Sequence, residues 1–507
     1  MTLPELIAWI EERLPKLGKA KGVAHAKKMY ALLDDVGADR AFRHEWHKLA
    51  KKIAKLTKEP PPDPPSNEIV RAKKPKREPV EINPQLQAAF DAVAQGRQII
   101  FVTGGAGTGK STFIRELQAR FETKNTVVLA PTGIAALTAG GQTIHSFCRL
   151  PLRPVLPEDI RDAEDRELIE AIELMIIDEI SMVRADMLDG VDMFLRRNRK
   201  STAPFGGVQI VLVGDLFQLP PVVTSRDEET IAQRYPTPHF FAAHALRGLK
   251  FFPVELEIVY RQRDASFAEL LASLRDGSGT HDAVRVLNER CTGRTLTGRY
   301  LTLMPTRRAA AEENEARLAE LTTKPSVYEA RRLGTFETVD DERLPAPLQL
   351  ALKPGAQVMF LRNDPERRWV NGTLGIVKSV EKGRVVVRLD DGATYEVEPV
   401  EWQDIRYTLD EETREIVDEV VGTYEQLPLM PAWAVTIHKA QGLTLDKVLV
   451  DLGRGAFAEG QVYVALSRCQ TLDGLSLRRP LRPHEIRVSR PAHEFYAKIR
   501  RRGRSEE

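Results

Sequence analysis

The chain has 507 residues, of which 42% are hydrophobic and 29% charged. At about 150 residues per domain this length predicts roughly three domains, and the composition excludes a wholly disordered or fibrous chain. The formal net charge is only +2, but residues 1–77 carry 18 basic and 10 acidic side chains, a net charge of +8, which leaves −6 for the remainder.

The sequence gives no sign of a membrane or secreted protein. It contains no run of about 18 apolar residues, so we predict no membrane-spanning helix and no membrane partner. Glu5, Glu11 and Glu12 lie within the first 20 residues, which is not typical of a secretory or transit peptide. The three cysteines, Cys148, Cys291 and Cys469, have no metal-ligand spacing. We therefore expect a reducing, cytoplasmic location, associated with the nucleoid in a prokaryote.

Residues 1–58 are predicted to form a basic helical accessory module, because apolar residues recur there at helical spacing, as from Leu3 to Leu14. Residues 59–81 follow as a stiff linker rich in proline and lysine. The positive charge of this N-terminal part indicates a polyanionic partner. A solvated lysine-rich face explains the charge equally well.

From residue 82 the pattern changes to alternating strands and helices. Short apolar runs at 99–102, 127–129, 174–177 and 210–213 have helical connections, which predicts a buried parallel sheet. Runs at 254–256, 300–303 and 447–450, with helices at 267–275 and 460–467, predict a second α/β unit. Between them, glycine-containing turns join short strands, which predicts a small antiparallel insert whose strands lie within 355–400. The fold class is α/β.

The segment GGAGTGKS at 104–111 matches the phosphate-binding pattern G-x-x-x-x-G-K-[ST] between a predicted strand and a predicted helix. Its backbone amides and the helix N-terminus would surround phosphate oxygens. We expect Lys110 to reach the β- and γ-phosphates and Ser111 to hold Mg²⁺. The predicted nucleotide ligands in this segment are Gly104, Gly105, Gly107, Thr108, Gly109, Lys110, Ser111 and Thr112. A chance glycine-rich turn is the alternative.

Two further loops follow buried strands. The apolar run 174–177 ends in Asp178 and Glu179, and carboxylates at this end of a parallel strand lie beside the phosphate loop. We expect Asp178 to hold Mg²⁺ and Glu179 to polarise the attacking water. Gln218 follows another core strand and could bond a γ-phosphate or its water, although a polar loop residue is the simpler interpretation of that position alone.

Taken in order, these motifs resemble those of superfamily-one helicases of the 5′→3′ branch. The motifs are GGAGTGKS (104–111), APTGIAA (130–136), TIHSF (143–147), DEISM (178–182), GDLFQLPP (214–221), YRQ (260–262), TIHKAQG (436–442) and VYVALSR (462–468). Within that branch, PFGGVQ at 204–209 is similar to the signature of the Pif-type (petite integration frequency) helicases. The resemblance covers residues 82–495.

The resemblance implies two RecA-like domains. Domain 1A would comprise residues 82–250 with a small 1B wedge near 148–168, and domain 2A residues 251–354 and 431–495. The insert at 355–430 would be the family's 2B β-barrel, and residues 496–507 a charged tail.

The resemblance also implies an ATP-dependent 5′→3′ DNA helicase that uses ATP and Mg²⁺ and acts in genome maintenance, including repair and recombination. Its partners would be single-stranded DNA and forked or tailed duplexes, with G-quadruplexes or RNA–DNA hybrids as further candidates, and it would act as a monomer. The alternatives are a P-loop ATPase or switch that binds nucleic acid without unwinding it, and a RecD-type helicase.

Residue roles follow from the matching motifs. Arg261 and Arg468 would be arginine fingers, although a surface ion pair is the common fate of a lone arginine, and Gly442 would contact nucleotide. In the family a glutamine before the phosphate loop contacts the adenine. The matching position in this chain is Leu86, which is flanked by Gln85 and Gln87, and we assign the role to Gln87. The DNA contacts would be Thr132, Gly133, His145 and Phe147 in 1A and His438, Lys439 and Thr444 in 2A. Core packing is an equal alternative for Phe147.

Overall fold

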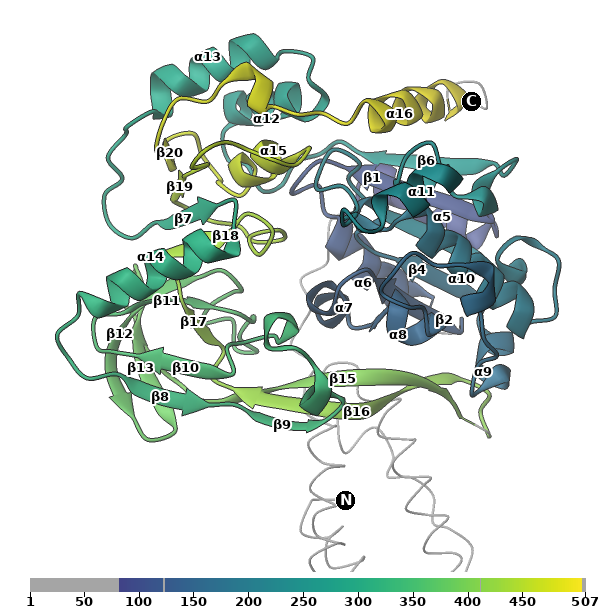
Figure 1. Ribbon diagram of the computed structural model, residues 1–507, viewed down its shortest axis with the longest axis horizontal. Coiled ribbons are helices and arrows are strands. Elements are labelled where there is room, and N and C mark those ends of the chain that lie inside the picture. The colour runs from purple at the N-terminus through teal and green to yellow at the C-terminus, as the bar shows by residue number, and fades with distance from the viewer. Residues whose placement is uncertain (1–81, 122–123, 411, 504–507) are drawn as a thin grey trace, which may run out of the picture. The chain divides into compact units, whose positions relative to one another are not determined.

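A computed structural model describes residues 82–121, 124–410 and 412–503. The predicted helical module at 1–58 and the predicted linker at 59–81 lie outside the described residues. The chain divides into two compact units, one of residues 1–83 with 406–419 and one of residues 84–405 with 420–507. The second unit is described below (Figure 1). Among the described residues, no helix is both long and apolar enough to cross a membrane.

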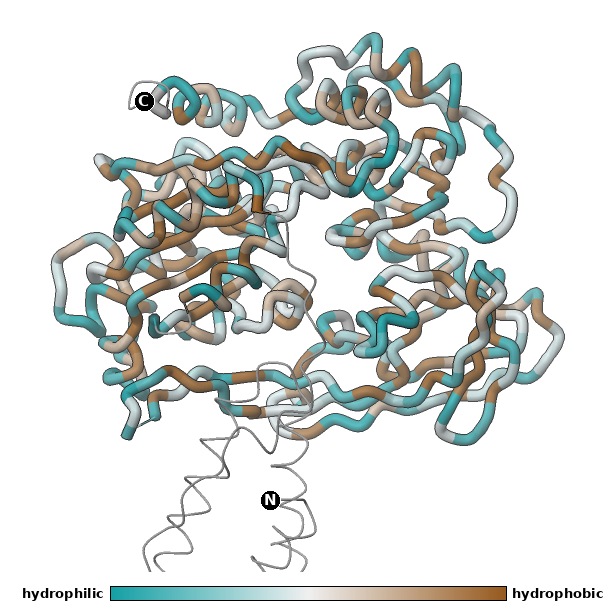
Figure 2. The backbone as a smooth tube through the Cα atoms, turned by 180° about the vertical axis from the view of Figure 1, so that it is seen from behind, coloured by the Kyte–Doolittle hydropathy of each residue, from teal (hydrophilic) through white to brown (hydrophobic). Residues whose placement is uncertain are grey.

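The first part of this unit is a six-stranded sheet in the order β3-β2-β4-β5-β1-β6, and all of its pairings are parallel. Every residue of β1 and of β5 is buried, as expected for strands covered on both faces. Figure 2 shows the hydrophobic colour following these strands. The strands are β1 (Ile99–Gly104), β2 (Thr126–Ala130), β3 (Gln142–Thr143), β4 (Leu174–Ile177), β5 (Gln209–Gly214) and β6 (Phe251–Leu256).

Helices connect these strands, as the alternating pattern predicted. Thr132 and Thr143 cap two of them by accepting hydrogen bonds from the amides of Ala135 and Ser146. The helices are α5 (Pro84–Ala94), α6 (Lys110–Arg120), α7 (Gly133–Ala139), α8 (Ile144–Cys148), α9 (Arg166–Ala171), α10 (Ala185–Asn198) and α11 (Glu228–Arg234). Between α8 and α9, residues 149–165 form a loop with one short turn, Pro157–Asp159.

The segment PFGGVQ forms a tight turn against α10. Phe205 and Gly206 have positive φ angles of 52° and 63°. The Phe205 amide donates to Asp192 Oδ1 at 2.6 Å, and Arg199 Nε donates to the Gly206 carbonyl at 2.9 Å. Both partners come from α10 or its C-terminal end. In this structure the signature segment is therefore held as part of the core of the first sheet.

One strand assignment from the sequence was wrong. The run at 254–256 was placed in the second α/β unit, but it lies in β6, which pairs with β1 along its whole length. β6 forms the edge of the first sheet beside β1, and no local pattern distinguishes an edge strand of one sheet from the first strand of the next.

The second sheet is also parallel and has the order β18-β7-β19-β20. Its core contains Phe267, Leu271 and Leu274 from the first of its helices, together with the buried strand residues. The strands are β7 (Leu301–Met304), β18 (Ala434–Thr436), β19 (Val448–Val450) and β20 (Leu475–Leu477), and the helices are α12 (Ala265–Asp276), α13 (Thr280–Cys291), α14 (Arg307–Ala319) and α15 (Gln461–Leu466).

The chain between β7 and β18 is mainly antiparallel. Five strands form a sheet in the order β14-β13-β12-β11-β17, with a bulge in β12 between Val377 and Ser379. Gly383 and Gly392 turn its two hairpins with φ angles of +84° and +86°. These strands are β11 (Gln357–Phe360), β12 (Leu374–Glu381), β13 (Arg384–Arg388), β14 (Thr394–Val397) and β17 (Leu429–Pro431).

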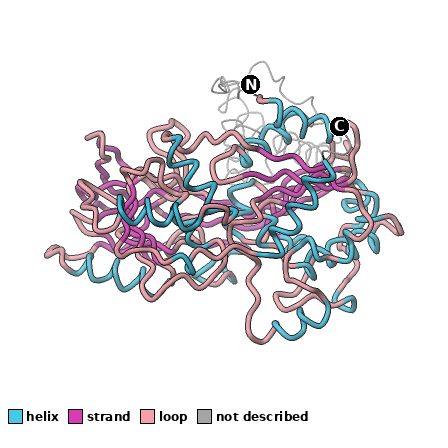
Figure 3. Tube along the Cα trace, turned by 90° about the horizontal axis from the view of Figure 1, so that it is seen from above, coloured by secondary structure: helices cyan, strands magenta, loops and turns pink. Residues whose placement is uncertain are grey.

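Two smaller sheets accompany it. One pairs β8 (Ser326–Glu329) with β10 (Gln349–Leu352), and the other has the order β15-β16-β9. The latter strands are β15 (Val400–Leu409), β16 (Ile416–Gln426) and β9 (Arg331–Gly334). In Figure 3 the strands gather in groups with helices around them.

The predicted charged tail at 496–507 begins within a helix, because α16 spans Arg490–Gly503. Phe495 stacks on Phe241 with ring centroids 4.5 Å apart and an interplanar angle of 8°. Arg500 Nη2 lies 2.7 Å from Glu255 Oε2 on β6. The last helix of the chain therefore returns to the first sheet.

Candidate nucleotide and DNA site

The phosphate loop connects β1 to α6. Gly107 and Gly109 have φ angles of +79° and +92°, which side chains rarely adopt. A Cβ at Gly107 would also lie 2.3 Å from Arg261 Cβ. The loop is therefore tight, and its amides precede an 11-residue helix whose N-terminus favours an anion.

Lys110, the first residue of α6, is partly buried against this loop. Its Nζ donates to the carbonyl oxygens of Gly104 at 2.9 Å and Gly105 at 2.8 Å. Burial lowers the pKa of Lys110, and the charges of Asp215 and Glu179 act against this. Of the other predicted ligands, Thr108 Oγ1 donates to the Gly105 carbonyl at 3.0 Å, while Ser111 and Thr112 lie in the first turn of α6.

Asp178 and Glu179 directly follow the last residue of β4, next to this loop. Glu179 has a φ of 48°, a strained value for a residue with a side chain, and such strain is frequent at functional sites. Burial, with the neighbouring Glu179 charge second, raises the pKa of Asp178 to about 7. Burial also raises the pKa of Glu179, opposed first by Lys110 and then by Arg468.

The predicted arginines both lie in this cluster. Arg468 is 1% exposed, and its Nε donates to the Val464 carbonyl at 3.0 Å. Burial first, and the charge of Arg261 second, lower the pKa of Arg468 to about 9. Arg261 Nε donates to Thr444 Oγ1 at 3.0 Å, and its Nη1 is buried without a hydrogen-bond partner in the described structure. Burial lowers the pKa of Arg261.

Gln441 links the acid to Gln218. Its Nε2 donates to Glu179 Oε2 at 3.1 Å and to Gln218 Oε1 at 3.3 Å. Gln218 Nε2 in turn donates to Asp215 Oδ2 at 3.2 Å. The structure thus brings Lys110, Glu179, Gln218, Arg261 and Arg468 into one connected cluster built from both parallel sheets.

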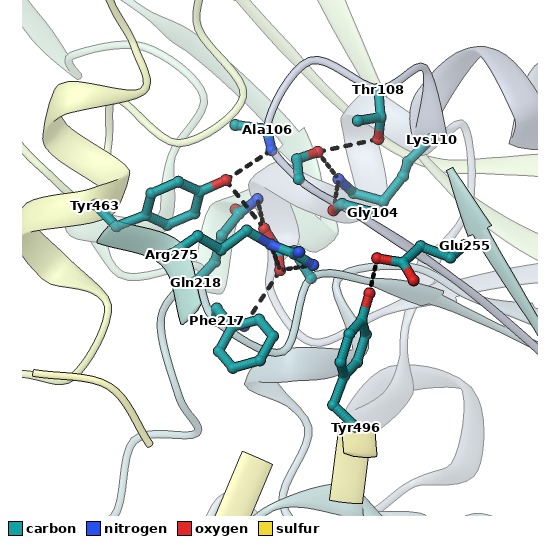
Figure 4. A network of polar contacts seen from close by, with 12 residues as sticks. Gly104, Ala106, Thr108, Lys110, Phe217, Gln218, Glu255, Arg275, Tyr463 and Tyr496 are labelled. Carbon is teal, nitrogen blue, oxygen red and sulfur yellow. Dashed lines mark hydrogen bonds and ion pairs between the residues drawn. The ribbon is translucent and has the colours of Figure 1, made fainter. Parts of the chain in front are cut away.

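Four residues of this cluster had no predicted role: Asp215, Arg275, Gln441 and Tyr463. Figure 4 shows Tyr463 pointing from α15 toward Ala106 of the phosphate loop, and Arg275 lying beside Phe217 and Tyr496. Asp215 could have been noticed, because it follows a buried strand as Asp178 does. Arg275 is the penultimate residue of α12 and belongs to none of the motifs, so no local sequence pattern pointed to it.

The two candidate adenine-reading glutamines differ in their contacts. Gln87 is exposed, and its Nε2 donates to Asp91 Oδ1 one helical turn later at 2.7 Å. Gln85 Oε1 accepts from the amide of Glu257 at 2.9 Å. Gln85 is therefore bonded to the chain that follows β6, the neighbour of β1, whereas Gln87 bonds within its own helix.

The predicted DNA residues before Arg149 lie at the ends of helices. Thr132 is exposed and caps α7, in which Gly133 is the first residue. His145 Nε2 is buried without a hydrogen-bond partner among the described residues, and burial lowers the pKa of this imidazole. Phe147 is 9% exposed and packs edge-on against Phe194 of α10. This is the packing expected of a core side chain.

The predicted DNA residues of the second sheet follow β18. Burial lowers the pKa of both His438 and Lys439, with the charge of Arg307 as the second cause. Thr444 is exposed and accepts the hydrogen bond from Arg261. The Gly442 carbonyl also accepts from Arg261, from Nη2 at 3.3 Å. The segment 436–444 thus carries the candidate DNA residues and is also bonded to Arg261 of the nucleotide cluster.

Comparison with known proteins agrees with these motifs. A family model of PIF1-like helicases matches residues 81–283. The chain is 34% identical over 405 residues to the ATP-dependent DNA helicase Pif1 of Bdellovibrio bacteriovorus, covering 78% of this chain and 88% of that protein. It is 34% identical to the human ATP-dependent DNA helicase PIF1 over 439 residues, covering 84% of this chain but 65% of the human protein.

Solved structures of Pif1 proteins are also similar to this chain, in both fold and sequence. Bacteroides sp Pif1 in complex with ADP-AlF4 has a TM-score of 0.76 and 36% identity, covering 83% of this chain and 97% of that one. Bacteroides Pif1 bound to single-stranded DNA has a TM-score of 0.62 and 37% identity, with the same coverage of both chains.

Proposed function

The chain belongs to the PIF1-like helicase family and is an ATP-dependent DNA helicase, and from this premise we propose that it moves 5′→3′ along single-stranded DNA and unwinds tailed or forked duplexes. The observation that supports the proposal is the cluster of Lys110, Glu179, Arg261 and Arg468. A lysine, an acid, the buried Arg468 and the partly buried Arg261 come from two parallel sheets and meet at one phosphate loop.

In this proposal each side chain has one task. Lys110 binds the β- and γ-phosphates. Glu179 accepts a proton from the attacking water and is held in place by Gln441. Arg261 and Arg468 stabilise the charge on the transferring phosphoryl group, and the unpartnered Nη1 of Arg261 is available for this. Gln218 orients the water, and Gln87, with Gln85 as the alternative, contacts the adenine.

The chemistry of the donors fits Mg²⁺. A serine hydroxyl at the start of α6 and a carboxylate at the end of β4 are hard oxygen ligands, and Mg²⁺ at such sites takes its remaining ligands from water and phosphate. Ser111 and Asp178 would hold the ion. When bound, it would neutralise charge on the phosphate oxygens.

For DNA we propose two contact regions. Thr132, Gly133 and His145 serve the first sheet, with Phe147 if its ring becomes exposed, and His438, Lys439 and Thr444 serve the second. Hydroxyls and amides suit phosphates, and rings suit base faces, so binding is tolerant of sequence. The bond from Arg261 to Thr444 supports coupling between nucleotide and DNA.

We extend the proposal to the domains. The part built on the first sheet acts as domain 1A with residues 148–168 as a wedge, and the part built on the second sheet acts as domain 2A. The antiparallel strands of 355–430 serve as domain 2B. G-quadruplexes and RNA–DNA hybrids are further candidate substrates, with the protein acting as a monomer and residues 1–58 assisting DNA binding.

Strand displacement with ATP on duplexes that carry either a 5′ or a 3′ single-stranded tail tests the proposal. We expect displacement only from the 5′-tailed duplex. Displacement from the 3′-tailed duplex would contradict the direction. Hydrolysis of ATP without displacement from either duplex would contradict unwinding.

A further inference from the structure

Asp215 is the centre of a hydrogen-bond network that joins both sheets. It follows β5 and is wholly buried. Its Oδ1 accepts from the Phe217 amide at 3.2 Å, and its Oδ2 accepts from Gln218 Nε2 at 3.2 Å and from Tyr463 Oη at 3.4 Å. Through Gln218 and Gln441 this carboxylate is connected to Glu179.

Tyr463 connects the same carboxylate to the phosphate loop. Its Oη accepts from the amide of Ala106 at 2.9 Å (Figure 4). A Cβ at Gly105 would lie 3.3 Å from this hydroxyl, so the tyrosine is packed directly against the loop. Asp215 is therefore connected to the loop through one partner and to the acid through another.

Arg275 supplies the charge that balances Asp215. It lies at the end of α12, on the second sheet, and its side chain is 14% exposed. Its Nε donates to Asp215 Oδ1 at 3.0 Å, and its Nη2 lies 2.9 Å from the same atom. The guanidinium lies 4.9 Å from the Phe217 ring centroid and 5.6 Å from that of Tyr496, which fixes its position.

Without Arg275, the nearest cation left to pair with the Asp215 carboxylate would be Lys110. Burial alone would raise the pKa of Asp215, but the charge of Arg275, followed by that of Lys110, keeps it below its usual value. Lys110 lies beside this pair, because its Nζ donates to the Gly105 carbonyl at 2.8 Å and a Cβ at Gly105 would lie 3.9 Å from Arg275 Nε. A buried carboxylate that loses its partner is costly, so Lys110 would be drawn to it and away from phosphate.

We propose that Arg275 is a positioning residue that neutralises Asp215, so that Lys110 stays available for nucleotide phosphates while Gln218 and Tyr463 keep their places. Arg275 touches neither nucleotide nor DNA in this account. The inference rests on the proposed role of Lys110 in phosphate binding.

The test compares full-length Arg275→Met with the double variant Asp215→Asn/Arg275→Met in DNA-stimulated ATPase assays. We expect Arg275→Met to raise the KM for ATP by at least about tenfold, because Lys110 must be withdrawn from Asp215 before phosphate can bind. The double variant removes both charges and should recover most of that change. Arg275→Lys, which keeps a positive charge, should have an intermediate KM.

A matched control separates this role from stability. Arg479 pairs with the buried Glu485, and its other hydrogen bonds go to the carbonyls of Gly453 and Pro480. Arg479→Met should lower the melting temperature and leave the KM for ATP unchanged. An unchanged KM in Arg275→Met, or a double variant no better than the single one, would overturn the inference. If Arg275→Met does not fold, a double variant that folds with a KM near wild type supports charge balance, and one with a raised KM overturns it.

Lys110→Ala distinguishes this inference from the proposed function. If Lys110→Ala hydrolyses ATP normally, the assignment of the nucleotide site fails. If Lys110→Ala is inactive and Arg275→Met has a wild-type KM, only the inference about Arg275 fails.

Discussion

Single charged residues in the cluster are costly to bury, and each has neighbours that offset this cost. Arg468 is buried near Arg261, a second cation, and the negative charges of Glu179 and Asp215 act in its favour. A like-charge pair in low dielectric is unfavourable until an anion joins it. The two arginines are therefore arranged for a ligand that carries negative charge.

Replacing these arginines tests that arrangement. Arg468→Ala and Arg261→Ala should each lower turnover, on the order of 10³-fold, because a finger acts on charge that develops in the transition state. Nucleotide affinity should change far less. Steady-state kcat and equilibrium nucleotide binding measure the two effects separately. An equal loss in both would show that the arginine binds the ground state instead.

Glu179→Gln tests the proposed base. The amide is nearly isosteric and can still accept the bond from Gln441, but it cannot take a proton as a carboxylate does. We expect nucleotide binding to persist and single-turnover hydrolysis to fall by about 10²- to 10⁴-fold. Hydrolysis near the wild-type rate would show that another group accepts the proton from the attacking water.

At the scale of elements, the turn Pro204–Gly207 shows how a signature segment serves packing. Gly206 has φ +63°, and a Cβ there would lie 2.9 Å from the Leu195 carbonyl oxygen, whereas Gly207 has φ +85° and open space around it. Both substitutions to alanine incur backbone strain, but only Gly206→Ala also meets α10.

We therefore expect Gly206→Ala to destabilise the protein more than Gly207→Ala, with the strain itself costing on the order of 1–3 kcal/mol at either position. Denaturant unfolding of the two variants measures the difference. Equal losses would show that contact with α10 adds nothing.

The elements also show what local sequence can predict. The phosphate loop, the strands β1, β4 and β5 and the acids after β4 follow from patterns confined to a few residues. The assignment of β6 to the first sheet did not follow from a local pattern, because strand pairing depends on residues that are far apart in sequence. The return of α16 to the first sheet depends on Phe241 and Glu255, which no periodicity within α16 reveals. Arg275 and Asp215 are 60 positions apart, and only the fold brings them together.

At the scale of the whole molecule, charge is divided along the chain, with +8 in residues 1–77 and −6 in the rest. A basic segment attached to a motor that binds DNA can contact phosphates beside the motor and release counterions. The alternative is that this segment binds another protein.

Substituting Lys73, Lys74, Lys76 and Arg77 by glutamine in the full-length chain tests the DNA role. Each lost phosphate contact should reduce the log–log salt dependence of single-strand binding by about 0.7. ATP hydrolysis at saturating DNA should be unchanged, because the nucleotide cluster begins after residue 82. A salt dependence identical to that of the wild type would favour a protein partner.

The return of α16 has a mechanical consequence. The chain leaves the first sheet after β6 and rejoins it at α16, so the part built on the second sheet is attached at two places, residues 257–264 and 478–489. A body held at two points keeps one easy rotation, about the line that joins them. Displacement then grows with distance from that axis, so a small closure at the phosphate loop becomes a larger sweep at the far rim.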